Sequence, residues 1–200
     1  MFVDACKQYW PLSCHVGSSE SGASGLGCAL SPAFVLTAHH VYQGNGPPVV
    51  VNTGGLWRCS VVREWVEDDL ALLRKEEKIK TAGADPVGTF PGWSTRMPSL
   101  GQSLGFLASL RGPRLRTYFG QGHIAFFDGE EGLRFGLAGA LVQRGFSGGP
   151  VFDPDAKLVG VLVEAYQFPT NLEPPTLVSM PLFSPIARIA PQLQQLVDPN

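Results

Sequence analysis

Short runs of β-branched or alternating apolar residues recur along the chain, and turn-forming residues separate them. Gly, Pro, Asn or Asp bounds most of these runs, which is typical of strands joined by tight turns. The runs fall into two groups, at residues 25–30, 34–37, 49–51, 57–62 and 70–73, and then at residues 103–107, 116–124, 133–137, 158–163 and 177–182. This pattern predicts an all-β protein built as two successive lobes.

Residues 74–98 differ from both groups of strands. They open with the charged run Arg-Lys-Glu-Glu-Lys and continue into sequence rich in Gly and Pro. Such a composition is typical of a connection rather than of a strand. We therefore expect residues 1–97 to hold an N-terminal segment, the first lobe and the connection, and residues 98–200 to hold the second lobe and a final helix.

Helical spacing occurs only near the end of the chain, in residues 184–197. Apolar residues there recur every three or four positions, at Ile186, Ile189, Leu193 and Leu196. Ser184 is predicted to cap the helix N-terminus, and Pro185 fits its first turn. Pro191 lies inside the pattern and is expected to kink or split the helix.

Composition and charge exclude several classes of protein. The 200 residues carry 15 Lys and Arg against 17 Asp and Glu, a net charge of −2, which argues against a nucleic-acid or anionic-membrane binder. Charged residues make up only 16% of the chain, so disorder is not expected. No uncharged apolar stretch has the length of a membrane span, and the first twenty residues lack a signal-peptide pattern. A soluble, cytoplasmic protein is expected.

Four cysteines are present, at Cys6, Cys14, Cys28 and Cys59. None of them forms a C-x-x-C pair, so a zinc or thioredoxin-type site is not expected, and no other metal constellation is visible. Without an export signal, reduced thiols are expected. Cys28 and Cys59 are interpreted as small apolar residues packed on strands. Whether Cys6 and Cys14 pair stays open.

Ser147 lies in the sequence Gly-Phe-Ser-Gly-Gly-Pro, residues 145–150. A serine among glycines can lie on a tight turn with its hydroxyl exposed and with backbone N–H groups converging nearby. Acyl transfer needs this geometry, because the developing oxyanion requires donors that are already in place. The alternative is a glycine-rich turn with an incidental serine.

The order of residues along the chain distinguishes the classes of serine hydrolase. The same sequence fits the G-x-S-x-G turn of α/β-hydrolases, in which the acid and the histidine follow the serine. All four histidines precede Ser147, at His15, His39, His40 and His123. That class is therefore excluded. A subtilisin-like order needs an aspartate before the histidine, and only Asp4, in a peripheral segment, precedes His40. The order that remains is histidine, aspartate, serine.

Two further segments fit that order and carry a family resemblance. Thr-Ala-His-His-Val occupies residues 37–41, and Asp-Leu-Ala-Leu-Leu occupies residues 69–73. Together with residues 145–150, they resemble the three motifs of the trypsin-like serine peptidases, over about residues 25–186. The pattern is most similar to the HtrA/DegP-type protease domain, with no PDZ domain after it. The resemblance implies an all-β fold of two six-stranded antiparallel β-barrels with a C-terminal helix, and no cofactor.

The resemblance also implies a role for each matching residue. Ser147 would be the nucleophile, His40 the general base and acid, and Asp69 the residue that orients the imidazole and stabilises its charged form. The backbone N–H groups of Gly145 and Ser147 would form the oxyanion hole. His39 is interpreted as a structural neighbour, and Asp68 as a solvated loop carboxylate.

Specificity can be inferred only coarsely from the matching positions. Leu141 and Val142 stand near the expected base of the specificity pocket, which favours a small or aliphatic residue before the cleaved bond. The alternative is that Leu141 belongs to the core. Val163, Glu164 and Ala165 match the strand that would pair with the backbone of an extended peptide or protein substrate.

Two departures from secreted trypsins bear on regulation and on the compartment. Phe146 stands where trypsin has an aspartate that pairs with a newly cut N-terminus, so activation by N-terminal cleavage is not expected. Phe146 is instead predicted to pack into an apolar pocket. The disulfide beside the trypsin histidine is not expected either, because Val41 follows His40; Cys28 is the nearest cysteine on the preceding strand.

The leading hypothesis is a serine endopeptidase, most simply a dedicated processing protease that cuts after a small or aliphatic residue. One alternative is a catalytically silent peptide-binding module of the same fold, or a protease that a partner activates. Another is an esterase-like or self-cleaving hydrolase. His123 is interpreted as a structural or surface residue, and an oligomer is possible but not indicated.

Overall fold

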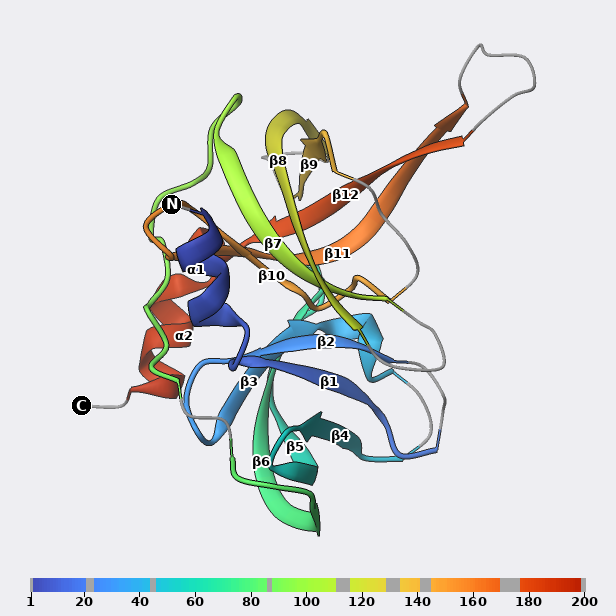
Figure 1. Cartoon of the computed structure of the whole chain (residues 1–200), viewed down its shortest axis with the longest axis vertical. Coiled ribbons are helices and arrows are strands. Elements are labelled where there is room, and N and C mark those ends of the chain that lie inside the picture. Colours follow the sequence, from blue (N-terminus) through green and yellow to red (C-terminus); the bar gives the residue numbers. More distant parts are fainter. Residues whose placement is uncertain are drawn as a thin grey trace.

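Six antiparallel strands close the first barrel of the computed structural model (Figure 1). Their order around the barrel is β1-β2-β3-β6-β5-β4, and β4 pairs with β1 to complete the ring. The strands are β1 (Ser13–Ser18), β2 (Ser24–Ala29), β3 (Phe34–Ala38), β4 (Pro48–Asn52), β5 (Gly55–Trp65) and β6 (Leu70–Thr81). The structure describes residues 2–20, 24–43, 46–85, 88–110, 116–128, 134–140, 145–169 and 177–198.

The second barrel repeats this arrangement in the order β10-β11-β12-β9-β8-β7. Its strands are β7 (Ser103–Leu110), β8 (Arg116–Asp128), β9 (Arg134–Ala138), β10 (Pro150–Phe152), β11 (Leu158–Pro169) and β12 (Leu177–Pro185). Buried phenylalanines fill its interior, among them Phe106, Phe135 and Phe183. β11 and β12 continue beyond the barrel as a long two-stranded arm (Figure 1).

The predicted all-β fold with two six-stranded antiparallel barrels is therefore confirmed. Three elements were missed by the sequence pattern. β1 contains a single β-branched residue, β10 has only three residues, and the N-terminal helix α1 (Phe2–Tyr9) mixes polar and apolar positions.

The interpretation of residues 74–98 as a connection is wrong at its beginning. The charged run lies within β6, which extends to Thr81 and pairs with β5 along its length. Neighbouring charges stabilise the run on this exposed part of the sheet. Arg58 pairs with Glu77 at 2.7 Å, and Arg74 pairs with Glu76 at 2.9 Å.

The C-terminal helix is present but starts later than predicted. Strand β12 runs to Pro185, a 3-10 helix follows at Ile186–Arg188, and helix α2 spans Ala190–Val197. The prediction of Ser184 as the helix cap is wrong, because Ser184 lies on the strand and its hydroxyl donates to the Asp68 carbonyl. Pro191 lies in the first turn of α2, where proline needs no N–H partner, so it does not kink the helix.

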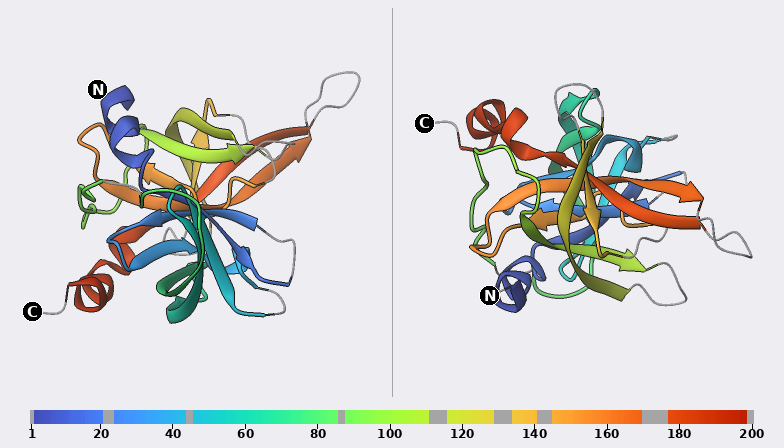
Figure 2. Two further views of the ribbon diagram at one scale, coloured as in Figure 1. Left: turned by 60° about the horizontal axis from the view of Figure 1, so that its bottom comes forward. Right: turned by 90° about the horizontal axis from the view of Figure 1, so that it is seen from above.

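The two terminal helices contact different barrels (Figure 2). Helix α1 contacts β7 of the second barrel, and the ring of Tyr9 stacks on Phe152 at 4.6 Å while its hydroxyl donates to the Ala156 carbonyl. Helix α2 reaches the first barrel, where the Trp65 indole donates to Gln192 at 2.6 Å. Each end of the chain therefore joins the barrels together.

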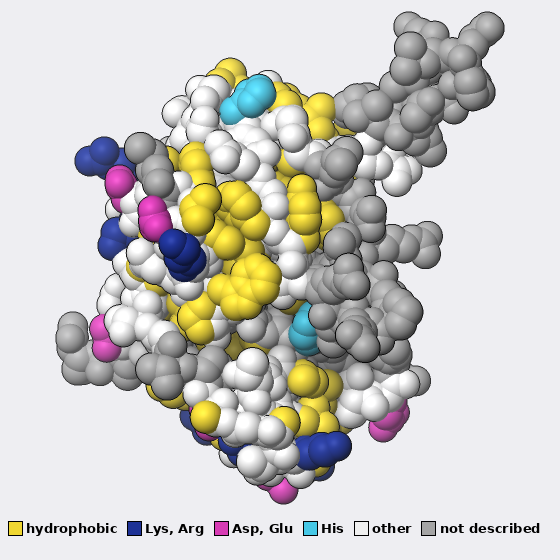
Figure 3. All heavy atoms as spheres, in the orientation of Figure 1, with side chains coloured by type: hydrophobic (Ala, Val, Ile, Leu, Met, Phe, Trp, Pro, Cys, Tyr) yellow, Lys and Arg dark blue, Asp and Glu magenta, His cyan; other side chains and the backbone are white. Residues whose placement is uncertain are grey.

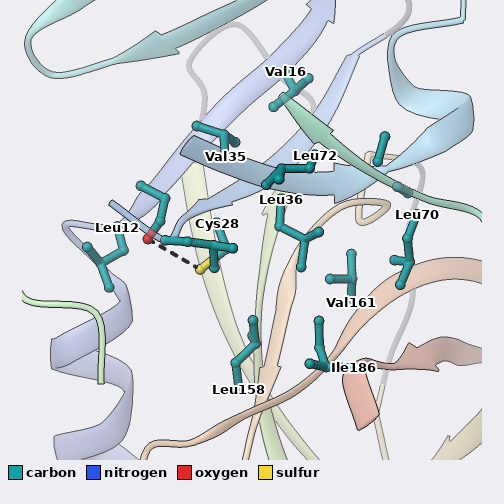
Figure 4. Close-up of a cluster of buried hydrophobic side chains, with 14 of the residues drawn as sticks. Leu12, Val16, Cys28, Val35, Leu36, Leu70, Leu72, Leu158, Val161 and Ile186 are labelled. Carbon is teal, nitrogen blue, oxygen red and sulfur yellow. Dashed lines mark hydrogen bonds between the residues drawn. The ribbon is translucent and has the colours of Figure 1, made fainter. Parts of the chain in front are cut away.

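A continuous apolar core extends from the first barrel into the second (Figure 4). Leu36 and Leu72 of the first barrel belong to the same buried cluster as Leu158, Val161 and Ile186. The four cysteines are also buried, and all are free thiols. The face in Figure 3 has a broad hydrophobic area near its middle, and charged side chains lie mainly toward its left side and its bottom. Within the described ranges, no helix has the length and apolar character needed to cross a membrane.

Candidate active site

Asp69 holds His40 at the edge of the first barrel through two hydrogen bonds. The imidazole Nδ1 lies 2.7 Å from Asp69 Oδ2, and the backbone N–H of His40 donates to Asp69 Oδ1 at 3.0 Å. Both carboxylate oxygens thus contact the same residue. This arrangement fixes the orientation of the ring and leaves Nε2 as its second nitrogen, on a side chain that is 43% exposed.

The backbone turn that carries Asp69 is strained. Asp69 has a φ of 52°, in the left-handed region that residues with a side chain seldom adopt. Its N–H donates to the Val66 carbonyl, and its own carbonyl accepts from the N–H of His39. These bonds place the carboxylate at the head of β6, directly beside the 3-10 helix His39–Val41.

His39 has a different environment from its neighbour His40. Its Nε2 lies 3.2 Å from Glu64 Oε1, and the side-chain amide of Gln43 contacts its ring. The Tyr42 hydroxyl also donates to Glu64, and this bond, with the nearby His39, holds the pKa of the Glu64 carboxyl below its usual value. These contacts agree with the structural role predicted for His39.

Ser147 lies on a tight turn between two glycines with positive φ. Gly145 has a φ of 101° and Gly148 a φ of 85°. A side chain at Gly148 would also collide with the Leu26 carbonyl, because a Cβ atom there would lie 1.7 Å from the oxygen. The turn therefore requires glycine at position 148.

The hydroxyl of Ser147 points toward the second barrel. It donates to the Val163 carbonyl at 3.3 Å, and within the described part of the chain it forms no hydrogen bond with His40. The Ser147 side chain can change rotamer about its single χ1 angle. The structure thus brings His40 and Asp69 into direct contact, whereas the Ser147 hydroxyl is directed to the Val163 carbonyl.

The turn of Ser147 is attached to the first barrel beside His40. The N–H of Leu26 donates to the Ser147 carbonyl at 2.7 Å. A Cβ atom at Gly25 would lie 2.4 Å from that carbonyl oxygen and 2.8 Å from Val41 Cγ2. Gly25, rather than Cys28, therefore faces the residue that follows His40, and Cys28 is fully buried in the core.

The oxyanion-hole candidates also lie on this turn. The N–H groups of Gly145 and Ser147 donate to no acceptor among the described residues, whereas the N–H of Gly148 donates to the Leu162 carbonyl at 2.7 Å. Leu141 and Val142, predicted near the specificity pocket, lie outside the described residues.

Phe146 packs into the apolar interior of the second barrel, as the sequence predicted. Its side chain is 5% exposed and its ring lies 6.2 Å from Tyr118 and 6.4 Å from Phe106. The residue between Gly145 and Ser147 is therefore anchored by aromatic packing.

The predicted substrate strand lies on β11, next to a bulge between Leu162 and Glu164. Val163 is buried, Glu164 is exposed and Ala165 is half-buried. The Glu164 carboxylate pairs with Arg134 of β9 at 2.5 Å. His123 is exposed on β8, in agreement with a surface role.

The interpretation of Asp68 as a solvated loop carboxylate is wrong. Asp68 is only 8% exposed, and its Oδ1 accepts a hydrogen bond from Arg188 Nε at 2.7 Å. Sequence reasoning missed this pair because the two residues lie 120 positions apart. The described ranges contain no group of His, Cys, Asp and Glu suited to a metal ion.

The fold and the His-Asp-Ser order define a class of protein, and comparison with known proteins agrees. The profile of the family described as "Trypsin-like peptidase domain" matches residues 25–161. The chain belongs to this family and is a trypsin-like serine endopeptidase. No curated protein sequence matches the chain.

Solved structures support the fold. The active form of the Rv3671c protease from M. tuberculosis matches with a TM-score of 0.72 and 18% identity, over 96% of this chain and 84% of that chain. The inactive form of the same protease matches with a TM-score of 0.68 and 18% identity, over 97% and 93%. The serine endoprotease from Yersinia pestis matches with a TM-score of 0.70 and 21% identity, over 100% and 67%.

Proposed function

We propose that the chain hydrolyses peptide bonds with His40, Asp69 and Ser147 as its catalytic residues. The observation that carries this proposal is the double contact between Asp69 and His40, which leaves Nε2 of the imidazole to act on a hydroxyl. The attachment of the Ser147 turn to the strand beside His40 supports the same assignment.

The reaction begins when the Ser147 hydroxyl turns from the Val163 carbonyl toward His40. Oγ attacks the carbonyl carbon of the peptide bond while its proton passes to Nε2 of His40. The N–H groups of Gly145 and Ser147 stabilise the negative oxygen of the tetrahedral intermediate. His40 then gives the proton to the leaving amine, and an acyl-enzyme remains on Oγ.

A water molecule then hydrolyses the acyl-enzyme, with His40 again transferring the proton. His40 takes a proton from the water as its oxygen attacks the acyl carbon, and it returns the proton to Ser147 Oγ as the acid product leaves. Asp69 keeps the imidazole oriented through both halves and stabilises it while it is charged. No group other than side chains, backbone donors and water takes part.

We further propose that the substrate is an extended peptide that pairs with the backbone of Val163, Glu164 and Ala165. Leu141 and Val142 favour a small or aliphatic residue before the cleaved bond, and the paired Glu164 has its charge balanced by Arg134. A cleavage profile on a peptide library tests this preference. Dominant cleavage after Arg or Lys would contradict it.

We also propose a dedicated processing role that needs no activating cleavage of the chain, and a cytoplasmic location. The aromatic packing of Phe146 supports independence from an activating cleavage, because its side chain has no charge with which to pair a newly cut N-terminus. The buried free thiols support the cytoplasmic location, because such thiols persist in reducing compartments.

The experiment that tests the proposed chemistry is labelling of the purified protein with a fluorophosphonate probe, alongside Ser147→Ala. The probe reacts with a serine whose hydroxyl is activated by a base. We expect labelling of the wild type and none of Ser147→Ala. A folded wild type that does not react would favour the alternative, a silent peptide-binding module or a protease that awaits a partner.

A further inference from the structure

The turn that carries Asp69 is held from behind by the second barrel. Ser184, at the end of β12, donates its hydroxyl to the Asp68 carbonyl at 2.5 Å. Arg188, in the 3-10 helix that follows, donates from Nε to the Asp68 carboxylate at 2.7 Å. The residue immediately before Asp69 is therefore bound at both its backbone and its side chain.

A second contact holds the other end of the same turn. The indole N–H of Trp65, the last residue of β5, donates to Gln192 of α2 at 2.6 Å. The turn between β5 and β6 thus lies between two hydrogen-bonded points, both made to the C-terminal segment. The proposed chemistry uses none of these contacts.

The Arg188–Asp68 pair is shielded from water. The Asp68 side chain is 11% exposed and that of Arg188 is 25% exposed, whereas the side chains of Arg58 and Glu77 in a β5–β6 pair are 53% and 62% exposed. Shielded pairs are weakly screened, and removal of one partner leaves an uncompensated charge in a poorly solvated place.

The contacts at Asp68 adjoin an unusual backbone conformation at Asp69. Its φ of 52° lies in a region that residues other than glycine seldom adopt, so contacts with the surroundings help to hold it there. Contacts at the adjacent Asp68 are well placed to do so. If the turn relaxed, the Asp69 carboxylate would move away from both of its contacts with His40.

We propose that Arg188 is a positioning residue that fixes Asp69 against His40 through its ion pair with Asp68. The second barrel thereby supplies the nucleophile and also holds the acid that lies on the first barrel. This inference rests on the proposed function, because it takes His40, Asp69 and Ser147 as the catalytic residues.

The rate of fluorophosphonate labelling measures the effect on chemistry. For Arg188→Gln we expect a fall of about tenfold to 100-fold in the second-order rate constant, the range that a displaced catalytic group costs. Arg188→Lys keeps the charge but loses the directed Nε–H, so it should lie between Arg188→Gln and the wild type. Arg58→Gln breaks the exposed pair with Glu77 on the first barrel, the barrel that carries Asp68. This variant should react with the probe at the wild-type rate.

A proton NMR signal separates positioning from mere stabilisation. The Nδ1–H shared by His40 and Asp69 is a charge-assisted bond of 2.7 Å and should give a strongly downfield resonance in the resting protein. His40→Ala identifies the signal by its loss. We expect the signal to be lost or moved upfield in Arg188→Gln, at a temperature well below its unfolding midpoint, and retained in Arg58→Gln.

The outcomes separate the inference from the function it rests on. A folded Arg188→Gln that labels at the wild-type rate and keeps the signal overturns the role of Arg188 and leaves the triad intact. If Arg188→Gln does not fold, Arg188→Lys decides, and a wild-type rate with an unchanged signal overturns the role. An unlabelled wild type, or equal labelling of Ser147→Ala, refutes the proposed function itself.

Discussion

The backbone N–H of Leu26 donates a 2.7 Å hydrogen bond to the carbonyl of Ser147. This bond joins β2 of the first barrel to the turn that carries Ser147, the proposed nucleophile, on the second barrel. Because His40 also belongs to the first barrel, the bond fixes the distance between the two halves of the site. The alignment of the proposed catalytic residues is therefore expected to depend on how closely the two backbones approach at Gly25 and Leu26.

A methyl group at Gly25 should weaken activity more than stability. The new Cβ would lie 2.4 Å from the Ser147 carbonyl oxygen, so the turn must move away from β2. We expect Gly25→Ala to reduce the rate of fluorophosphonate labelling by about tenfold or more, since small displacements of reacting groups are costly.

The matched control for this variant is Gly101→Ala. Gly101 is likewise a glycine, but it lies in a turn with a φ of 77° and has no atoms within 4 Å of the position of a Cβ. Its cost should be limited to backbone strain, with labelling unchanged. Equal labelling rates for Gly25→Ala and the wild type would show that the close approach does not align the site.

Removal of the buried Phe146 ring should destabilise the protein and weaken the packing that holds the turn of Ser147. The side chain is 5% exposed and packs against Phe106 and Tyr118. We expect Phe146→Ala to lower the free energy of unfolding by about 3 to 5 kcal/mol, the usual cost of emptying such a site. Urea unfolding measures this cost, and labelling at low temperature measures activity.

The control for the Phe146 variant is Phe127→Ala, because Phe127 is 49% exposed on β8. It should change stability little. A Phe146→Ala protein as stable and as active as Phe127→Ala would contradict the anchoring of the turn by aromatic packing.

The buried thiols should be inert until the protein unfolds. Burial raises the pKa of the Cys14 and Cys59 thiols to about 12, and it raises the pKa of Cys28 as well. Since the thiolate is the reactive form, a disulfide reagent at about pH 8 should modify these residues very slowly in the native state. In denaturant, all four cysteines should react at once. Rapid native labelling mapped to Cys14 or Cys59 would contradict their burial.

His15 should make the protein less stable in mild acid. Burial lowers its pKa from the ordinary value of 6.5. As the pH falls through that value, the unfolded chain takes up the proton first, so stability decreases until the folded form also becomes protonated. The free energy of unfolding, measured between about pH 8 and about pH 5, should fall less steeply in His15→Gln than in the wild type.

His123→Gln is the control for that pH series, because His123 is exposed on β8. It should retain the wild-type slope. The same slope in His15→Gln and the wild type would show that the acid sensitivity arises elsewhere.

The strands of both barrels could be predicted where an apolar run in the sequence is also buried in the fold. Val35 and Leu36 are buried apolar residues in a short run, β3, that turn residues bound. The ordered motifs place His40 just after this strand, in the 3-10 helix, and Ser147 in the turn before β10. The charged part of β6 was misread because Glu77 is stabilised by Arg58 on the neighbouring strand, which no local pattern shows.

The contacts that Ser184 and Arg188 make with Asp68 could not be predicted either, because they join residues far apart in the sequence. Ser184 has the sequence of a helix cap, with a proline directly after it, yet its hydroxyl donates to Asp68 in the other barrel. Asp68 has the sequence of a solvated carboxylate, and only the folded chain brings Arg188 to it. Long-range pairs of this kind are fixed by the packing of the two barrels.

Ser147 is proposed as the nucleophile that His40 activates, and the residue that carries the covalent adduct shows whether this assignment holds. The wild type is treated with the fluorophosphonate probe, digested and mapped by mass spectrometry, with His40→Ala treated in parallel. We expect a single adduct on Ser147 in the wild type and none in folded His40→Ala. An adduct on a different residue, or equal modification of Ser147 in both proteins, would contradict the claim.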